Sequence, residues 1–351
     1  MIKVLRVLTL LCAVPAMVVH AGQVADLYQA DVAVEGDWQQ TALKQVLVRV
    51  SGKSDIVAGQ ELESEFKQAS AYIKQFEAVR HADGNRMRVL LDAVKINQLL
   101  QQHNIAVWGA LRPDILVWLV QQDEDKRTFV RRSEQPLNAA LLQSFGQAGL
   151  PLLLPLYDMD DLLTLSETDV WAGFWQQINQ ASVRYRPDVV VVAAVDRIEQ
   201  GDGVVFRLNW QRQDNGRTFR DEITAKDESS LMQSFAASLS SQLAQQYASL
   251  MSAQAGTDYV LEVQRLTDLA ALVQVQKLLQ QVVGVSEVTI VRYDSDSAHY
   301  KLSSNISAEG LMNALRFNPR LRVATEDNAE QYQSMNTIEQ SVLSRFEYIK
   351  P

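Results

Sequence analysis

Hydrophobic residues recur along the chain with alternating helical and strand periods, and this pattern predicts three successive α/β units. In the first unit, residues 24–34 have the pattern of a strand, and residues 38–50 carry apolar side chains at three- and four-residue spacing, as in a helix. Gly52 follows, and glycine is the usual residue just past a helix end. We expect this unit to span residues 22–110 and to be completed by a helix near 62–71, strands near 72–79 and 87–93, and a helix over 95–103.

The second unit is expected over residues 111–252. Pro113 disfavours helical geometry at Arg112, and the apolar run from Ile115 to Val120 is typical of a strand that is covered on both faces. Asp214-Asn215-Gly216 is a strong signal for a hairpin turn. The remaining predicted elements are a polar loop (121–134), a helix ending near 147, a helix over about 169–182, strands at 189–195, 204–212 and 218–225, and a long helix over about 231–251.

The third unit, residues 257–325, shows the clearest order of elements. Strand and helix periods alternate as β-α-β-β-α-β, which is the ferredoxin-like pattern. The predicted fold class is therefore α+β or α/β, with several small mixed-sheet units in tandem. Residues 326–351 are polar and rich in Gln, Ser and Glu, so we expect them to form a flexible, loosely docked tail.

Residues 1–21 have the pattern of a secretory signal peptide. Lys3 and Arg6 are basic, and the apolar stretch that follows them, residues 7–19, is too short to span a bilayer. Val19 and Ala21 are small residues at the positions that signal peptidase reads. We therefore expect export to the periplasm and cleavage near Ala21–Gly22; if uncleaved, the same segment would act as an anchor.

Composition narrows the class of protein further. The only cysteine, Cys12, lies in the signal and follows Leu11, which argues against lipidation and leaves the exported chain without disulfides or thiolate metal sites. The net charge is −9 and becomes about −11 once Lys3 and Arg6 are removed. Such a charge argues against nucleic acid as a partner. Beyond the signal, no apolar run approaches the roughly 20 residues that a transmembrane helix needs.

No catalytic, cofactor-binding or metal-binding constellation is predicted. Gly52-Lys53-Ser54 resembles the end of a phosphate-binding loop, but Leu47 stands where that motif requires glycine. A Gly-x-Ser-x-Gly motif is absent from the sequence. The histidines beyond the signal are widely separated, which gives little support for a metal site; they are His81, His103 and His299.

Five residues are candidates for a binding surface. Asp158 and Asp160 belong to an acidic run that either offers oxygen ligands to calcium or, as we favour, begins a helix. Arg184 and Tyr185 lie at a helix-to-strand connection, where open α/β sheets often bind ligands or partners. The alternative is that Tyr185 packs and Arg184 pairs with a nearby carboxylate. Arg49 raises a similar choice, because it lies near a helix end and complements the helix dipole.

The sequence resembles the DUF2066 family, uncharacterised exported proteins of proteobacteria, over most of residues 22–325. The resemblance rests on the signal and on the segments ADLYQADVAV, LKQVLVRVSG, RPDILVWLV, GLPLLLPLYDMDD and ASVRYRPDVVVVAAV. Family members usually carry a more basic stretch before the first helix, whereas this chain has Glu35-Gly36-Asp37. More remotely, the first two units are similar to modules of the flagellar outer-membrane protein FlgT and of the amino-terminal domain of TolB, which act as docking surfaces.

Two hypotheses about function follow. The first is a non-catalytic periplasmic binding or scaffold protein that acts in assembly or maintenance of the cell envelope, with an envelope protein of unknown identity as its partner. The alternative is a periplasmic hydrolase or small-ligand-binding protein that uses the middle unit, with Asp158, Asp160, Arg184 and Tyr185 around a cleft.

The signal generates a direct prediction. Mass spectrometry of the protein recovered from the periplasm should find a chain that begins near Gly22. Replacing Ala21 with a bulky residue such as Leu should leave a membrane-bound precursor, because the peptidase accepts only small side chains at that position. The matched change His20→Leu should leave cleavage intact. An intact Met1 or an acylated Cys12 in the periplasmic protein would contradict the interpretation.

Overall fold

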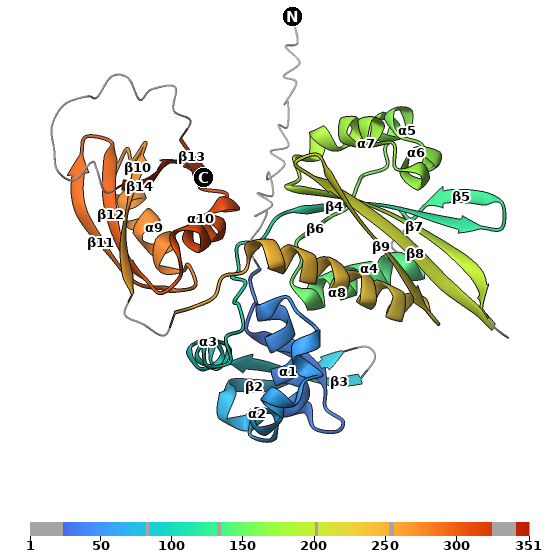
Figure 1. The fold of residues 1–351 in the computed structure, drawn as a ribbon, viewed down its shortest axis with the longest axis horizontal. Helices are drawn as coiled ribbons and strands as arrows, with labels where there is room; N and C mark the ends of the chain where they lie inside the picture. The colour runs from blue at the N-terminus through green and yellow to red at the C-terminus, as the bar shows by residue number, and fades with distance from the viewer. Residues whose placement is uncertain are drawn as a thin grey trace, which may run out of the picture.

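Three sheets follow one another along the chain, the first and third with one hydrophobic core each and the second with a core on each face (Figure 1). The structure is a computed structural model and describes residues 24–81, 84–131, 135–200, 203–252, 256–324 and 342–350. The arrangement confirms the predicted fold class of tandem small α/β units with mixed or antiparallel sheets. The predicted signal, residues 1–21, lies outside the described residues.

The first unit packs one long helix on a three-stranded antiparallel sheet of order β1-β3-β2. Apolar residues of the helix α1, among them Leu43, Val46 and Leu47, are fully buried. Gly52 ends α1 in the left-handed region at φ 72°, and its N–H donates to the Val48 carbonyl, as the sequence predicts. The elements are β1 (Gln29–Ala33), α1 (Trp38–Ser51), α2 (Glu63–Lys67), β2 (Ile73–His81), β3 (Gly84–Leu91) and α3 (Ala93–Gln102).

The second unit is built on a mixed sheet of order β5-β4-β7-β8-β9, with the short β6 also paired to β4. The central strands β4 and β7 are parallel, whereas β7, β8 and β9 form an antiparallel meander. The turn between β8 and β9 uses positive φ at Asn215 and Gly216, which confirms the predicted hairpin. The strands are β4 (Ile115–Asp123), β5 (Lys126–Phe129), β6 (Leu152–Leu153), β7 (Val189–Gln200), β8 (Gly203–Asp214) and β9 (Arg217–Ala225).

Helices cover both faces of this sheet, as the uninterrupted apolar run of β4 predicts. Alternate residues of β4 point to opposite faces, so Val117 belongs to the core beneath α4 and α8, while Trp118 belongs to the core beneath α5, α6 and α7. Figure 1 shows these two sets of helices on opposite sides of the strands. Their bounds are α4 (Pro136–Ala148), α5 (Met159–Thr164), α6 (Glu167–Ala172), α7 (Trp175–Ser182) and α8 (Glu228–Tyr247).

Two predicted elements of the second unit are wrong. Residues 121–134 are not simply a polar loop, because β4 continues through Gln121 to Asp123 and turns into β5. The helix expected over about 169–182 is divided into α6 and α7 at Gly173, which adopts a left-handed φ of 71°. Polar residues can form an edge hairpin without an apolar signal, and a single glycine suffices to end a helix.

The third unit contains the predicted β-α-β-β-α-β order and one additional strand. Its sheet has the order β11-β12-β10-β14-β13, and α9 and α10 supply apolar residues to its core. The elements are β10 (Thr257–Gln264), α9 (Leu269–Gln280), β11 (Val285–Asp294), β12 (Ser297–Ser304), α10 (Ala308–Arg316), β13 (Leu321–Val323) and β14 (Val342–Tyr348).

Strand β14 corrects the prediction that residues 326–351 form a flexible tail. It lies between β10 and β13, parallel to the former and antiparallel to the latter. Phe346 and Tyr348 point into the core and are 1% and 4% exposed. The chain that follows the ferredoxin-like order therefore returns to complete the same sheet.

This correction changes what should fold in isolation. A fragment of residues 256–350 should unfold cooperatively and give dispersed amide resonances. A fragment of residues 256–326 lacks β14 and the burial of Phe346 and Tyr348. Each such side chain contributes about 1.5–3 kcal/mol, a large share of the roughly 5–15 kcal/mol that stabilises a domain. The shorter fragment should therefore show a weak or absent thermal transition, and equal melting curves for the two would contradict the assignment.

Candidate functional site

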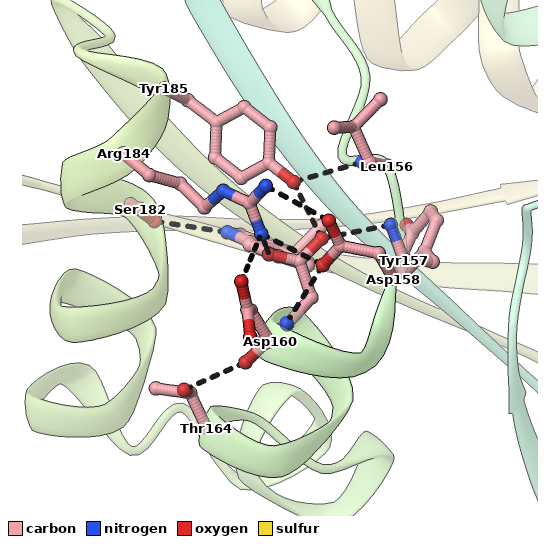
Figure 2. A network of polar contacts seen from close by, with 10 residues as sticks. Leu156, Tyr157, Asp158, Asp160, Thr164, Ser182, Arg184 and Tyr185 are labelled. Carbon is pink, nitrogen blue, oxygen red and sulfur yellow. Dashed lines mark hydrogen bonds and ion pairs between the residues drawn. The ribbon is translucent and has the colours of Figure 1, made fainter.

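The sequence candidates Asp158, Asp160, Arg184 and Tyr185 meet on one side of the second unit (Figure 2). Asp158 is the N-cap of α5, and its carboxylate accepts a hydrogen bond from the Asp161 N–H. Arg184 and Tyr185 come from the 3₁₀ turn (Val183–Tyr185) that follows α7. The acidic run thus begins a helix, as favoured from the sequence, and the arginine of the next connection reaches back to it.

Arg184 forms a bidentate ion pair with Asp158 through the two terminal nitrogens of its guanidinium group. Nη1 lies 2.7 Å from Oδ1 and Nη2 lies 2.9 Å from Oδ2, which is the bidentate geometry of a strong charge-assisted pair. Asp160 lies at the margin of the network, with its carboxylate 3.9 Å from Nη1 and its side chain 84% exposed.

Asp161, which the sequence analysis did not select, is the centre of the network. Its side chain is 1% exposed and accepts from the Tyr157 N–H at 2.8 Å and from the Tyr185 hydroxyl. Arg184 also contacts it at 3.3 Å. The Tyr185 hydroxyl in turn accepts from the Leu156 N–H at 2.9 Å. These bonds hold the turn before α5, where Tyr157 has a positive φ of 52°.

The electrostatics of the network favour fixed charges over proton transfer. The hydrogen bonds from Arg184 hold the pKa of Asp158 below its usual range, and the same contacts raise the pKa of Arg184. Burial, together with the hydrogen bond to Asp161, raises the pKa of Tyr185 to about 12. At neutral pH, Asp158 and Arg184 are therefore a stable ion pair and Tyr185 is a protonated donor, so none of the three is poised as a general acid or base.

Aromatic packing fixes the network to the sheet. The Trp118 ring on β4 makes edge contacts with Tyr157 and Tyr185, at centroid distances of 5.6 and 6.0 Å. Its Nε1–H donates to the Ser182 hydroxyl at 3.0 Å. We call residues 156–185 the cap, and these contacts couple the start of α5 and the end of α7 to the central strand.

The outer surface of the cap is unusually apolar. Six large hydrophobic side chains are exposed between residues 156 and 183, whereas the next densest described stretch of similar length, 269–293, exposes four. The most exposed of them is Leu163, at 78%. The six are Leu156, Met159, Leu162, Leu163, Phe174 and Val183.

Arg49 does not belong to this surface. It is buried, and its guanidinium donates to the carbonyl of Gln147 at 2.8 Å and to the carbonyls of Asp26 and Gln29. Burial lowers its pKa. The reading of Arg49 as part of a binding surface is therefore wrong, because its donors are used to join α1 to the last turn of α4.

In the described part of the chain, no three histidine, cysteine or carboxylate side chains gather where they could hold a metal ion. The calcium reading of the acidic run fails for a specific reason, since Arg184 occupies both oxygens of Asp158. None of the helices that the structure describes combines the length and apolar composition that a membrane crossing requires.

Comparison with known proteins gives one partial match. Residues 21–109 match the model of a family described as a domain of unknown function (DUF8605). The match covers about a quarter of the chain and takes in the elements from β1 to α3. No curated protein and no solved structure matches the chain.

The network predicts different roles for two adjacent carboxylates. Asp161→Ala should lower the free energy of unfolding by about 1–3 kcal/mol, because the buried Tyr157 N–H loses its acceptor. Asp160→Ala, one residue away in the same helix turn, should change it by no more than about 0.5 kcal/mol, because that side chain is exposed. Urea denaturation of both variants measures the contrast, and equal shifts in midpoint would refute it.

Proposed function

We propose that the protein is a non-catalytic binding protein of the periplasm that docks a partner protein of the cell envelope through its cap. The proposal rests on one observation above all, the six exposed apolar side chains on α5 and on the turns next to α5 and α7. Clustered exposed hydrophobic side chains are costly to leave in water and commonly mark interaction surfaces.

The charge of the cap indicates the chemistry of the partner. Residues 156–185 contain five acidic residues and a single basic one, Arg184, which is already paired with Asp158. A complementary surface would place apolar side chains against Leu163 and Met159 and lysine or arginine side chains around them. Opposite charges at the rim of an interface favour specificity and association rate.

The polar network supports a binding role because it orders the cap in the absence of a partner. Bonds from Arg184 and Tyr185 to the first turn of α5 fix the helix that carries Met159, Leu162 and Leu163. A surface that is already ordered loses less conformational entropy on association than a flexible one.

The alternative, a hydrolase or small-ligand-binding protein that uses the middle unit, has less support from the same residues. Asp158 and Arg184 neutralise each other, and the raised pKa of Tyr185 keeps its hydroxyl protonated. The cavities of about 390 and 320 Å³ are lined by other residues. The periplasmic location is proposed from the expected signal in residues 1–21.

A photoreactive amino acid at position 163 tests the proposal. In periplasmic extract, it should form a crosslink to one protein, and Met159→Glu should abolish that crosslink by placing a charge on the apolar surface. The yield should fall when ionic strength rises from about 0.1 to about 1 M, because the screening length shortens from about 10 to about 3 Å.

The control is the same photoreactive residue at Val204, which lies on β8 of the same unit and is 61% exposed. It should give no such product. Crosslinks of equal yield at both positions, or crosslinks that are insensitive to Met159→Glu, would show that the cap is not the docking surface.

A further inference from the structure

We infer that the cavity where the three units meet is a binding site for a small organic anion with an apolar body. This cavity has a volume of about 390 Å³, within the roughly 300–1,000 Å³ of typical small-molecule sites. One wall comes from the connection between the first two units, residues 107–111, and from the end of α8. The other comes from α9 and from the segment between α10 and β13 in the third unit.

Uncompensated positive charge lines the cavity. Lys277 near the end of α9 and Arg320 before β13 are the charged residues of the lining, and no aspartate or glutamate accompanies them. Within the described part of the chain, neither side chain forms an ion pair or hydrogen bond. In a protein of net charge −9, two unpaired cations at one cavity favour an anionic ligand.

Two buried donors in the lining also lack acceptors among the described residues. Asn318 is 6% exposed, and its Nδ2 group is unpaired. Its Oδ1 accepts from the Arg320 N–H at 2.9 Å, which fixes the orientation of the amide and leaves Nδ2 as the free end. Trp108 is 2% exposed, and its Nε1–H is likewise unpaired. Buried donors of this kind are rare unless something accepts from them, and oxygen atoms of an anion are suitable acceptors.

The rest of the lining is suited to an apolar body. Hydrophobic side chains from all parts of the cavity wall contribute, including Val107, Leu111, Leu278, Val282, Ile306 and Pro319. A ligand with one anionic group and a short hydrocarbon or aromatic portion would satisfy both halves of the site. Inorganic anions would satisfy only the charged half, and neutral or cationic amphiphiles only the apolar half.

Titration calorimetry with octanoate, below its micellar concentration, tests the inference. Octanoate should bind the full exported chain, whereas octylamine, which has the same tail and the opposite charge, and inorganic phosphate should bind at least about tenfold more weakly. The double variant Lys277→Gln/Arg320→Gln should weaken octanoate binding by about tenfold or more, since hydrogen bonds to charged groups are the strong ones. The control Lys226→Gln/Arg322→Gln removes two exposed cations outside the lining and should leave binding unchanged.

Three results would contradict the assignment of this cavity as an anion site. Undetectable octanoate binding, equal binding of octylamine or phosphate, or equal weakening by both double variants would each overturn the inference. Circular dichroism checks that each variant folds. If Lys277→Gln/Arg320→Gln does not fold, the variant Ala314→Trp is used instead. It fills the cavity while both cations remain, and it should likewise weaken octanoate binding. Leu163→Glu on the cap should not affect octanoate binding, so failure of the proposed docking function and failure of this site are distinguishable.

Discussion

Two buried arginines hold the first and second units together, and the geometry at the centre of the molecule depends on them. Arg112 is fully buried and donates to main-chain carbonyls on both sides of the junction, among them those of Arg49 and Gly149. Arg49 donates across the same junction to Gln147. Neither guanidinium has a hydrogen-bonded carboxylate partner in the described residues. Their charge is instead met by carbonyls at the ends of α1 and α4, where the helix dipoles are negative.

This arrangement explains why arginine suits both positions. Only the planar guanidinium offers five donors in a fixed fork, and burial lowers the pKa of Arg112 to about 9, still well above neutral pH. Gly149 is equally constrained, because its φ is +66° and a Cβ there would lie 2.9 Å from the Arg49 side chain. Arg112 also lies over the Trp108 ring, 4.1 Å from its centroid, so the junction shapes a wall of the inter-unit cavity.

Much of the fold could be predicted from local sequence patterns. The parts that could not be predicted depend on contacts between residues far apart in the chain. The apolar run of β4, the Asp-Asn-Gly hairpin and the glycine after α1 are local signals, and each is confirmed. Strand β14 depends on pairing with β10, about 80 residues earlier in the chain, and its sequence mixes three polar residues with four apolar ones. Its two buried aromatic residues gain their environment only when the sheet is assembled, so periodicity alone could not reveal it.

The candidate site shows the same limit. That Asp158 begins a helix and Arg184 pairs with a carboxylate follows from residue types near helix ends. Asp161 was missed because an acidic run on a helix start is ordinarily exposed, as Asp160 is, whereas Asp161 is buried. Arg49 was misread for the complementary reason, since charged residues are seldom fully buried and its acceptors lie at least 20 residues away, the Gln147 carbonyl of α4 nearly 100. One sequence signal for Asp161 was its spacing. It stands three residues after the N-cap Asp158, at the position where an acidic side chain often bonds back to the chain that precedes the helix.

The two proposed binding regions draw on helices that cover opposite faces of the second-unit sheet. The cap rests on the β4 face that carries Trp118, while α8, whose last residue Tyr247 lines the inter-unit cavity, rests on the face that carries Val117. The cavity lining and the cap have no residue in common. Closely packed cores resist continuous deformation, and distant sites without shared contacts usually contribute additively to free energy. A ligand at the junction should thus leave the binding properties of the cap unchanged.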